Sequence, residues 1–315
     1  MEKKGVAVVA VGGNSLIKDE THRTVPDQYA AAQASMSPIA DMIAQGWDVV
    51  VTHGNGPQVG FILRRSELSR GELHPVPLDF CGADTQGAIG YMFVMALHNE
   101  FLKRGIDRKA IAVVTQTIVD RNDKAFQNPS KPIGSFLDEK TAHERTEKEG
   151  WTVVEDAGRG WRRVVPSPIP QRIVEAAAMR SLIDAGFTVV GVGGGGIPVL
   201  EDPDGTLHGV EAVIDKDYGS ALLATMINAD LFVISTAVEQ VAINFNKPNQ
   251  QWLSRMTMAE AEAYGTEGHF AKGSMLPKIQ AILQYLKRGG KQALITDPAN
   301  MGRALRGETG TWIVP

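Results

Sequence analysis

Near its N-terminus the chain reads Val6-Ala7-Val8-Val9-Ala10-Val11-Gly12-Gly13-Asn14. Six apolar residues without a polar interruption, most of them β-branched, favour a buried strand. The glycines and the asparagine end that strand in a turn. Because glycine has no Cβ, the backbone N–H groups of such a turn can close around the oxygens of an anion. The stretch therefore predicts a buried strand with an anion-binding turn at its carboxyl end.

Two further apolar runs end in the same way. Residues 49–51 lead into Gly54-Asn55-Gly56, and Thr188–Val190 leads into a glycine-rich turn at residues 191–196. One such turn is a weak signal, but three suggest several strand ends that converge on one anion. The three turns together predict phosphate chemistry.

The same rhythm continues along the chain and predicts the fold class. Four times along the chain, a segment with helical periodicity is followed by a glycine and then by a run of β-branched residues. The four glycines are Gly46, Gly105, Gly186 and Gly289. Each glycine stands where a left-handed helix C-cap is expected. Leu231–Ser235 adds a strand after a small-residue helix at 220–229. This alternation indicates an α/β fold with a mainly parallel sheet, whose ligands bind beyond the carboxyl ends of the strands.

Composition excludes several classes of protein. The chain has 315 residues, 43% hydrophobic and 22% charged, with a net charge of -4, as is ordinary for a soluble globular protein. That charge predicts neither a nucleic-acid partner nor a membrane partner. No apolar stretch approaches the roughly 20 residues of a membrane span, and residues 6–11 are too short for a secretory signal. Cys81 is the only cysteine, so we expect a packed side chain, no intrachain disulfide and a cytoplasmic location.

The alternation of helical and strand segments is interrupted at residues 119–166, which are rich in charged and turn-forming residues. Residues 151–154 and 161–165 are expected to pair as a hairpin around 156–160. We therefore predict an inserted, protruding subdomain within a single domain spanning residues 1–315. For the charged segment at 138–149 we expect a solvated excursion without a function of its own. A second hairpin is predicted from 197–200 and 206–213, joined by Asp202-Pro203-Asp204-Gly205.

Two phosphate-binding motifs can be set aside. Gly191, Gly193 and Gly196 have the spacing of a dinucleotide-binding loop, but such a loop must open a helix. Here residues 197–200 continue as an extended segment, so the match is accidental. No P-loop occurs either, because Gly290-Lys291 is followed by Gln292.

Phosphoryl transfer also needs full positive charge, which glycine turns do not supply. Lys131 lies between two prolines that stiffen its backbone. Lys216 lies between Asp215 and Asp217, whose carboxylates could orient it or hold a magnesium ion. Lys278 begins a helix that runs to about residue 287. Each lysine alone is more typical of solvated surface, and only their agreement with the glycine turns favours a site.

The histidines offer no clear catalytic role. His53 stands between a strand and a glycine turn, where it could act as a general base or brace the loop by a hydrogen bond. The other six have no zinc-like spacing with one another or with Cys81. We expect no transition-metal site.

Taken together, seven segments resemble the signature segments of carbamate kinases. They are spread in order over nearly the whole chain and read VVAVGGNS (8–15), THGNGPQVG (52–60), NPSKPIG (128–134), EDAGRGWRRVVPSP (155–168), GGGGIPV (193–199), VEAVIDKDYGSALL (210–223) and GSMLPK (273–278). Carbamate kinases have the amino-acid-kinase fold and interconvert ATP plus carbamate with ADP plus carbamoyl phosphate.

The resemblance implies a three-layer α/β/α sandwich with an open, mainly parallel sheet, a protruding subdomain at 119–166 and a homodimer. It implies that Mg²⁺ accompanies ATP or ADP, and that the enzyme makes ATP in a nitrogen-catabolic pathway of the arginine, agmatine, purine or allantoin type. Asp217 matches the residue that organises the lysines. The implied catalytic residues are Lys131, Lys216, Asp217 and Lys278. Those implied at the carbamoyl phosphate end are Gly12, Gly13, Asn14, Gly54, Asn55 and Gly56. Those implied at the nucleotide are Gly193, Gly194, Asp215, Lys216, Ala237, Val238, Met275, Pro277 and Lys278.

Three positions depart from the family pattern, namely Asp84, Ile169 and Ala242. They suggest a carbamate-kinase-like branch and keep two alternatives open. One is a kinase of another small carboxylate or carbamate. The other is a nucleotide-binding regulator that has lost turnover, against which the retention of the three lysines and Asp217 argues.

Overall fold

An eight-stranded sheet forms the centre of the computed structural model, which describes residues 3–12, 16–17, 19, 21–155 and 160–315. Its strand order is β15-β17-β16-β12-β1-β2-β9-β3, and every pairing is parallel except that of β16 with β17. The strands are β1 (Gly5–Val11), β2 (Trp47–His53), β3 (Ala110–Ala112), β9 (Thr188–Val190), β12 (Leu231–Ser235), β15 (Arg255–Thr257), β16 (Ala293–Thr296) and β17 (Thr311–Val314). The prediction of a mainly parallel α/β sheet is confirmed.

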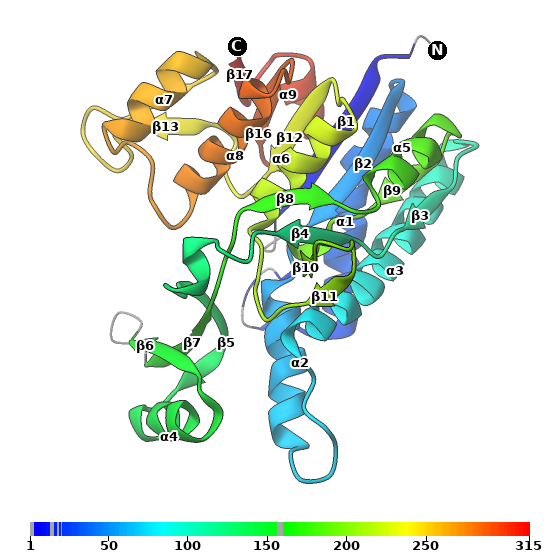
Figure 1. Ribbon diagram of the computed structural model, residues 1–315. Helices are drawn as coiled ribbons and strands as arrows, with labels where there is room; N and C mark the ends of the chain where they lie inside the picture. The colour runs from blue at the N-terminus through cyan, green and yellow to red at the C-terminus, as the bar shows by residue number, and fades with distance from the viewer. Residues whose placement is uncertain (1–2, 13–15, 18, 20, 156–159) are drawn as a thin grey trace.

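Helices cover both faces of this sheet (Figure 1). Alternate residues of β1 pack into two separate cores, because successive side chains of a strand point to opposite faces. Val6, Val8 and Ala10 belong to the core with α5 (Ala176–Asp184), α6 (Lys216–Met226) and α8 (Met275–Lys287). Ala7, Val9 and Val11 belong to the core with α1 (Val25–Ala44), α3 (Leu78–Arg104) and α9 (Met301–Leu305). The expected three-layer sandwich is therefore present.

The predicted helix-ending glycines have the backbone conformation that the pattern required. Gly46, Gly105, Gly186 and Gly289 all have positive φ, between 64° and 98°. They turn the chain from a helix back into the sheet. Within the described residues, none of the helices combines the length and the apolar character that crossing a bilayer requires.

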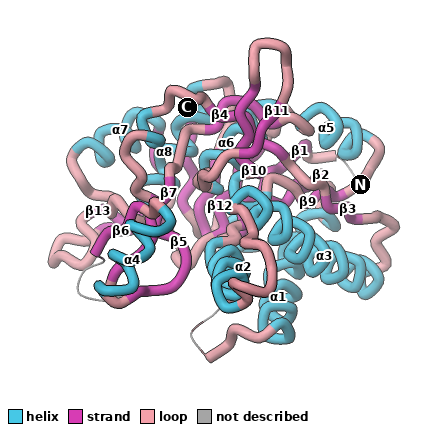
Figure 2. The backbone as a smooth tube through the Cα atoms, turned by 60° about the horizontal axis from the view of Figure 1, so that its bottom comes forward, coloured by secondary structure: helices cyan, strands magenta, loops and turns pink. Residues whose placement is uncertain are grey.

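Two smaller sheets flank the carboxyl edge of the main sheet, as the tube in Figure 2 shows from below. One has the order β11-β10-β4-β8, and in it β10 (Ile197–Glu201) and β11 (Leu207–Gly209) form the second predicted hairpin. Its other strands are β4 (Gln116–Val119) and β8 (Pro170–Ile173). The remaining described elements are α2 (Gly56–Leu68), α7 (Met258–Thr266), the antiparallel pair β13 (Val241–Ile243) and β14 (Gln251–Leu253), and the 3₁₀ turns at Lys124–Phe126 and Gly193–Gly195.

The second small sheet contains β5 (Lys131–Leu137), β7 (Trp161–Val165) and β6 (Thr152–Glu155), in that order. Together with α4 (Glu139–Glu149) we call it the small sheet unit. The predicted pairing of β6 with β7 is confirmed, while four residues of the expected turn, 156–159, lie outside the described residues. Most of the small sheet unit stands away from the main sheet, below it in Figure 1.

The charged segment 138–149, expected as a solvated excursion without function, forms helix α4, and most of its residues are exposed. The Asp138 carboxylate accepts a hydrogen bond from the Thr141 backbone N–H at 2.9 Å and caps the helix, which ends at Gly150 with φ of +68°. Ala142 is buried, and Glu149 forms an ion pair with Arg70 beyond the end of α2. A helix with so few apolar residues is hard to predict because its periodicity is weak.

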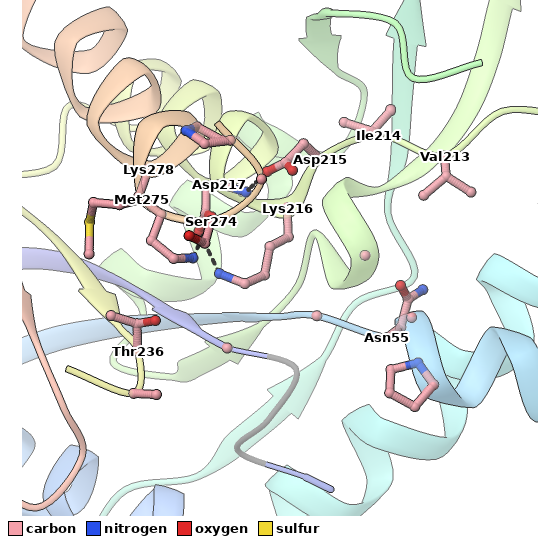
Figure 3. Close-up of a pocket in the computed structure, with 18 of the residues that line it drawn as sticks. Asn55, Val213, Ile214, Asp215, Lys216, Asp217, Thr236, Ser274, Met275 and Lys278 are labelled. Carbon is pink, nitrogen blue, oxygen red and sulfur yellow. Dashed lines mark hydrogen bonds and ion pairs between the residues drawn. The ribbon is translucent and has the colours of Figure 1, made fainter. Parts of the chain in front are cut away.

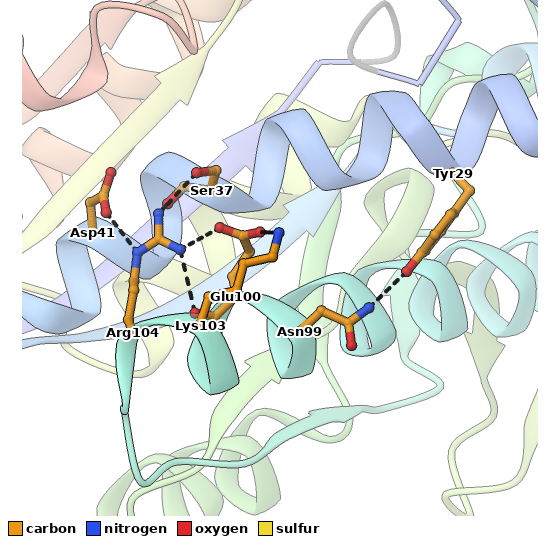
Figure 4. Close-up of polar contacts among 7 residues, drawn as sticks. All are labelled: Tyr29, Ser37, Asp41, Asn99, Glu100, Lys103 and Arg104. Atoms are coloured by element: carbon orange, nitrogen blue, oxygen red, sulfur yellow. Dashed lines mark hydrogen bonds and ion pairs between the residues drawn. The ribbon is translucent and has the colours of Figure 1, made fainter.

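A polar cluster joins α1 to α3 across one helical layer (Figure 4). Arg104 donates from Nε to Asp41 Oδ1 at 2.8 Å and from Nη2 to Ser37 Oγ at 2.9 Å, and it also pairs with Glu100. The Glu100 side chain is only 8% exposed. The Arg104 guanidinium therefore compensates a buried carboxylate and links the two helices.

Replacing Arg104 by Ala is expected to lower the free energy of unfolding by about 2 kcal/mol, because it removes one of the two cationic partners of the buried Glu100 carboxylate, the other being Lys103. Urea denaturation followed by circular dichroism measures the change. Arg306→Ala is the matched control, since it breaks an ion pair between Arg306 and Glu308 in which both side chains are at least 46% exposed. Equal stability of both variants would contradict the interpretation of the cluster.

Candidate active site

A cavity of about 730 Å³ opens at the carboxyl ends of four neighbouring strands, β12, β1, β2 and β9. The first residue after β1, after β2 and after β12 lines it: Gly12, Gly54 and Thr236. Backbone hydrogen bonds continue the parallel ladder into these turns, from Gly12 N to Ser235 O and from Gly54 N to Val11 O, both at 3.1 Å. The first two glycine turns therefore meet at one cavity, as their sequence predicts, although Gly13 and Asn14 lie outside the described residues.

Asp217 lies between two lysines in this cavity (Figure 3). Lys216 Nζ donates to Asp217 Oδ1, and Lys278 Nζ donates to Asp217 Oδ2 at 2.9 Å. The three side chains are only 13%, 5% and 15% exposed for Lys216, Asp217 and Lys278. Lys278 comes from the first turn of α8, whereas Lys216 and Asp217 begin α6. One carboxylate thus fixes two ammonium groups from different helices.

Burial and charge act in opposite directions on these groups. Burial would raise the pKa of Asp217, but Lys216 and Lys278 outweigh it and hold that pKa at about 2. Burial lowers the pKa of Lys216, as does the neighbouring Lys278, while Asp217 opposes both effects. The Asp217 carboxylate is therefore charged at neutral pH and favours the ammonium form of Lys216.

The two carboxylates that flank Lys216 in the sequence have separated roles. Asp217 bonds Lys216, but Asp215 bonds Lys131, whose Nζ lies 2.9 Å from Asp215 Oδ2. Asp215 Oδ1 accepts the Asp217 backbone N–H at 2.9 Å, so that Asp215 is the N-cap of α6. The helix therefore starts at Lys216, four residues earlier than the sequence pattern indicated, because the N-cap and not the apolar run sets its start.

The helix α2 begins at the second glycine turn. Its N-cap residue, Asn55, gives no side-chain hydrogen bond to the helix and donates instead from Nδ2 to Thr85 Oγ1 at 2.9 Å. Gly54, Asn55, Gly56 and Pro57 all line the cavity. An amino end without a side-chain cap carries partial positive charge and favours an anion.

The third glycine turn contributes mainly close packing. Gly194 lines the cavity with φ of +67°, and a Cβ there would lie 2.3 Å from Asn55 Nδ2. Gly193 is not among the lining residues, because it lies behind Gly194 and accepts a hydrogen bond from Gln86 Nε2 at 3.0 Å. A strand, β10, follows the turn, so the accidental nature of the dinucleotide-binding spacing is confirmed.

His53 and Cys81 are structural residues here. His53 is 1% exposed, its Nδ1 lies 3.1 Å from Gly54 O, and its ring packs edge-on against Phe93. Burial lowers its pKa to about 4, so the ring is neutral and braces the turn. Cys81 is fully buried, and burial raises the pKa of its thiol to about 11. The expectation of a packed cysteine is confirmed.

Another part of the cavity is lined by residues that the sequence places at the nucleotide, together with residues that it did not indicate. Ala237, Val238, Met275 and Pro277, which the resemblance implies at the nucleotide, line it. Sequence reasoning missed a set of lining residues whose only common feature is that packing brings them to this edge: Ala31, Ala34, Ser35, Pro57, Val213, Ile214, Gly273, Ser274 and Pro298. Five of them lie within the quoted segments without an assigned role, namely Pro57, Val213, Ile214, Gly273 and Ser274. No sequence signal marks the residues of α1.

No group of three or more metal-ligating side chains occurs among the described residues. The departures at Asp84, Ile169 and Ala242 do not line the cavity either. Asp84 is exposed on α3, the Ile169 side chain is 44% exposed, and Ala242 is buried in β13.

Residues 5–297 match the model of the amino acid kinase family. Over 314 residues the chain is 51% identical to the carbamate kinase-like protein YahI of Escherichia coli, covering 99% of each chain. It is 48% identical over 311 residues to the carbamate kinase of Thermococcus kodakarensis, covering 98% of each. The carbamate kinase of Giardia lamblia bound to AMP-PNP is a similar solved structure, with a TM-score of 0.93, 39% identity and coverage of 98% of each chain. The resemblance found in the sequence is confirmed. The chain belongs to the amino acid kinase family, in the group of the carbamate kinases and carbamate kinase-like proteins.

Proposed function

We propose that this protein transfers a phosphoryl group between carbamoyl phosphate and ADP, and that it works mainly in the direction of ATP. One observation carries the proposal: a single buried carboxylate, Asp217, holds two lysine ammonium groups in a cavity at the ends of parallel strands. Phosphoryl transfer needs such fixed positive charge, because negative charge spreads over the moving group. The substrate carbamate, which accepts the phosphoryl group from ATP in the reverse direction, is inferred from the names of the similar proteins.

The cavity offers a place for each substrate. Gly12, Gly54, Asn55 and Gly56 would hold the carbamoyl phosphate end by backbone N–H groups, as would Gly13 and Asn14. Gly194 and Asp215 would lie near the nucleotide phosphates, whereas Gly193, expected there from the sequence, is not among the residues that line the cavity. The adenine would rest on Ala237, Val238, Met275 and Pro277. Lys131, Lys216 and Lys278 would then surround the transferred group, which passes from the carbamate oxygen to an oxygen of the ADP β-phosphate.

The chemistry needs no catalytic base. In the reverse reaction carbamate is already an anionic oxygen nucleophile, so no side chain has to remove a proton from it. The neutral, buried His53 agrees with this, since its lowered pKa suits a bracing role. The protein's main task is therefore to hold two anions in line.

Mg²⁺ would enter with the nucleotide. The cavity contains two carboxylates, Asp215 and Asp217, both already bonded to lysines. This donor set suits a cation held mainly by phosphate oxygens and water, as is usual for Mg²⁺ in kinases, and Asp217 is the carboxylate that would add a protein ligand. Bound in this way, Mg²⁺ would neutralise part of the charge on the phosphates.

No observation favours the alternative functions. The departures at Asp84, Ile169 and Ala242 lie outside the cavity lining, so they do not argue for a different carboxylate acceptor. The charges on which turnover depends are all present, which argues against a regulator without activity.

We further propose a single domain, 1–315, in which residues 119–166 form an inserted, protruding subdomain that carries Lys131.

We also propose a homodimer in the cytoplasm, where ATP and ADP are available. One face of α3 supports the dimer: Phe80, Tyr91 and Leu102 follow one another at eleven-residue intervals, three helical turns, and are 60%, 65% and 75% exposed.

The activity is tested by incubating the pure protein with ADP, Mg²⁺ and carbamoyl phosphate and measuring ATP by luciferase. We expect ATP formation, and a decrease of about 100-fold or more in Lys216→Ala, because one fixed charge beside the phosphoryl group is lost. Lys287→Ala is the matched control, an exposed lysine in the last turn of α8. No ATP above the Lys216→Ala level would contradict the proposal, and faster turnover of acetyl phosphate would indicate another acceptor.

Replacing Asp217 by Asn should lower kcat about 100-fold and move the alkaline limb of the kcat profile to lower pH. Without the carboxylate, burial lowers the pKa of Lys216 further, so the ammonium is lost at a lower pH. Initial rates from about pH 6 to about pH 10 check this. Asp184→Asn, at an exposed ion pair, is the control. An alkaline limb that stays in place would contradict the role of Asp217.

The double variant with Tyr91→Asp and Leu102→Asp carries two charges on the exposed face of α3. We expect it to be a monomer. Each protomer would bring two carboxylates to the two-fold contact, so that four would be buried there. Sedimentation velocity measures the change. Leu68→Asp is the control, because Leu68 is 70% exposed at the end of α2. A wild-type monomer, or a double variant that remains dimeric, would rule out this interface.

A further inference from the structure

The third lysine of the cavity, Lys131, has a carboxylate partner of its own. It is the first residue of β5, in the small sheet unit, whereas Asp215 precedes α6. Their side chains meet with Lys131 Nζ 2.9 Å from Asp215 Oδ2, and they are 37% and 22% exposed. Lys131 is thus the most exposed of the three lysines and the one that comes from outside the helical layer.

The Asp215 carboxylate is fixed at both of its oxygens. Oδ1 accepts the Asp217 backbone N–H at 2.9 Å, which aligns the carboxylate with the start of α6. Oδ2 is then directed at Lys131. The same helix turn carries Lys216 and Asp217. The bond to Asp215 therefore fixes the position of the Lys131 ammonium relative to these two charged groups.

The backbones around this ion pair are also joined. Val213 N donates to Pro166 O at 2.9 Å, and Ser130 N donates to Val165 O at 3.2 Å. Val165 belongs to β7 and packs with Ile133 of β5 in a small apolar cluster to which Val213 is adjacent. The segment that carries Asp215 and the strand that carries Lys131 therefore share a common support.

We propose that Asp215 is a positioning residue that holds the Lys131 ammonium at the cavity, as Asp217 holds Lys216 and Lys278. The inference rests on the proposed function for its effect on turnover. A long lysine side chain loses rotamer freedom when it is ordered around a reacting group. The ion pair with Asp215 restricts Lys131 before the reaction and so lowers the barrier.

Asp215→Asn separates this role from helix capping. Asparagine caps helices as well as aspartate does, and its single carbonyl oxygen would accept the Asp217 N–H. Its amide NH₂ would then face Lys131 and offer no charge. We expect an unchanged melting temperature, a kcat lowered about ten- to hundredfold, and a smaller change in KM for ADP.

A double-mutant cycle identifies the residue through which Asp215 acts. Lys131→Met should lower kcat, and adding Asp215→Asn should lower it no further, because the two residues act together. Glu211→Gln is the matched control: it removes an ion pair of the same segment with Arg163 of the small sheet unit, without touching Lys131, and kcat should remain within about twofold. An Asp215→Asn effect that persists in the Lys131→Met background would overturn the proposal and indicate a direct role toward Mg²⁺ or nucleotide.

A second measurement needs no turnover. Competitive acetylation at low reagent concentration, read by mass spectrometry of the peptide containing Lys131, reports how freely this amine reacts. We expect several-fold faster labelling in Asp215→Asn than in the wild type or in Glu211→Gln. Equal labelling in all three proteins would overturn the proposed ion pair, whereas faster labelling in a protein that makes no ATP would contradict only the proposed function.

Discussion

The Asp217 carboxylate stands between two buried ammonium groups, and the surrounding architecture makes this arrangement possible. Lys216 and Lys278 would each repel the other if the carboxylate were absent, and each would lose solvation without compensation. Their helices, α6 and α8, pack on the same face of the sheet and bring their amino ends to one cavity. The ion pairs on Asp217 therefore depend on the parallel sheet, which directs both helices to its carboxyl edge.

The helix ends around the cavity differ in how they are capped. Asp215 caps α6 with its own carboxylate, while α2 and α8 begin without a side-chain cap. Capping by an acid places negative charge where Lys131 and α6 meet, and uncapped ends leave partial positive charge facing the cavity. The distribution suits a site that must hold two anions and still keep its lysines in fixed positions.

Much of the fold could be predicted from local pattern. Apolar runs such as residues 6–11 and glycines such as Gly105 determine strands and helix ends through backbone sterics, which act over a few residues. Among the elements that escaped prediction, α4 and β5 have weak periodicity, and their structure depends on partners far away, such as Arg70 for Glu149. The start of α6 was misplaced for a related reason: the apolar run begins after the helix does, and Asp215 sets its first turn.

The sequence by itself determined the parallel α/β class, the family resemblance and the identity of the charged residues, because glycine turns, strand composition and motif order are local properties. The resemblance implied that Asp217 organises the lysines, but only the tertiary structure decided that Asp215 is the carboxylate that bonds Lys131. Asp215 and Asp217 flank Lys216 equally in the sequence, yet one bonds Lys131, 84 residues away, and the other bonds Lys216 and Lys278. Such pairing follows from the direction of side chains at a helix start and from the packing of distant strands, neither of which is encoded in the spacing of residues.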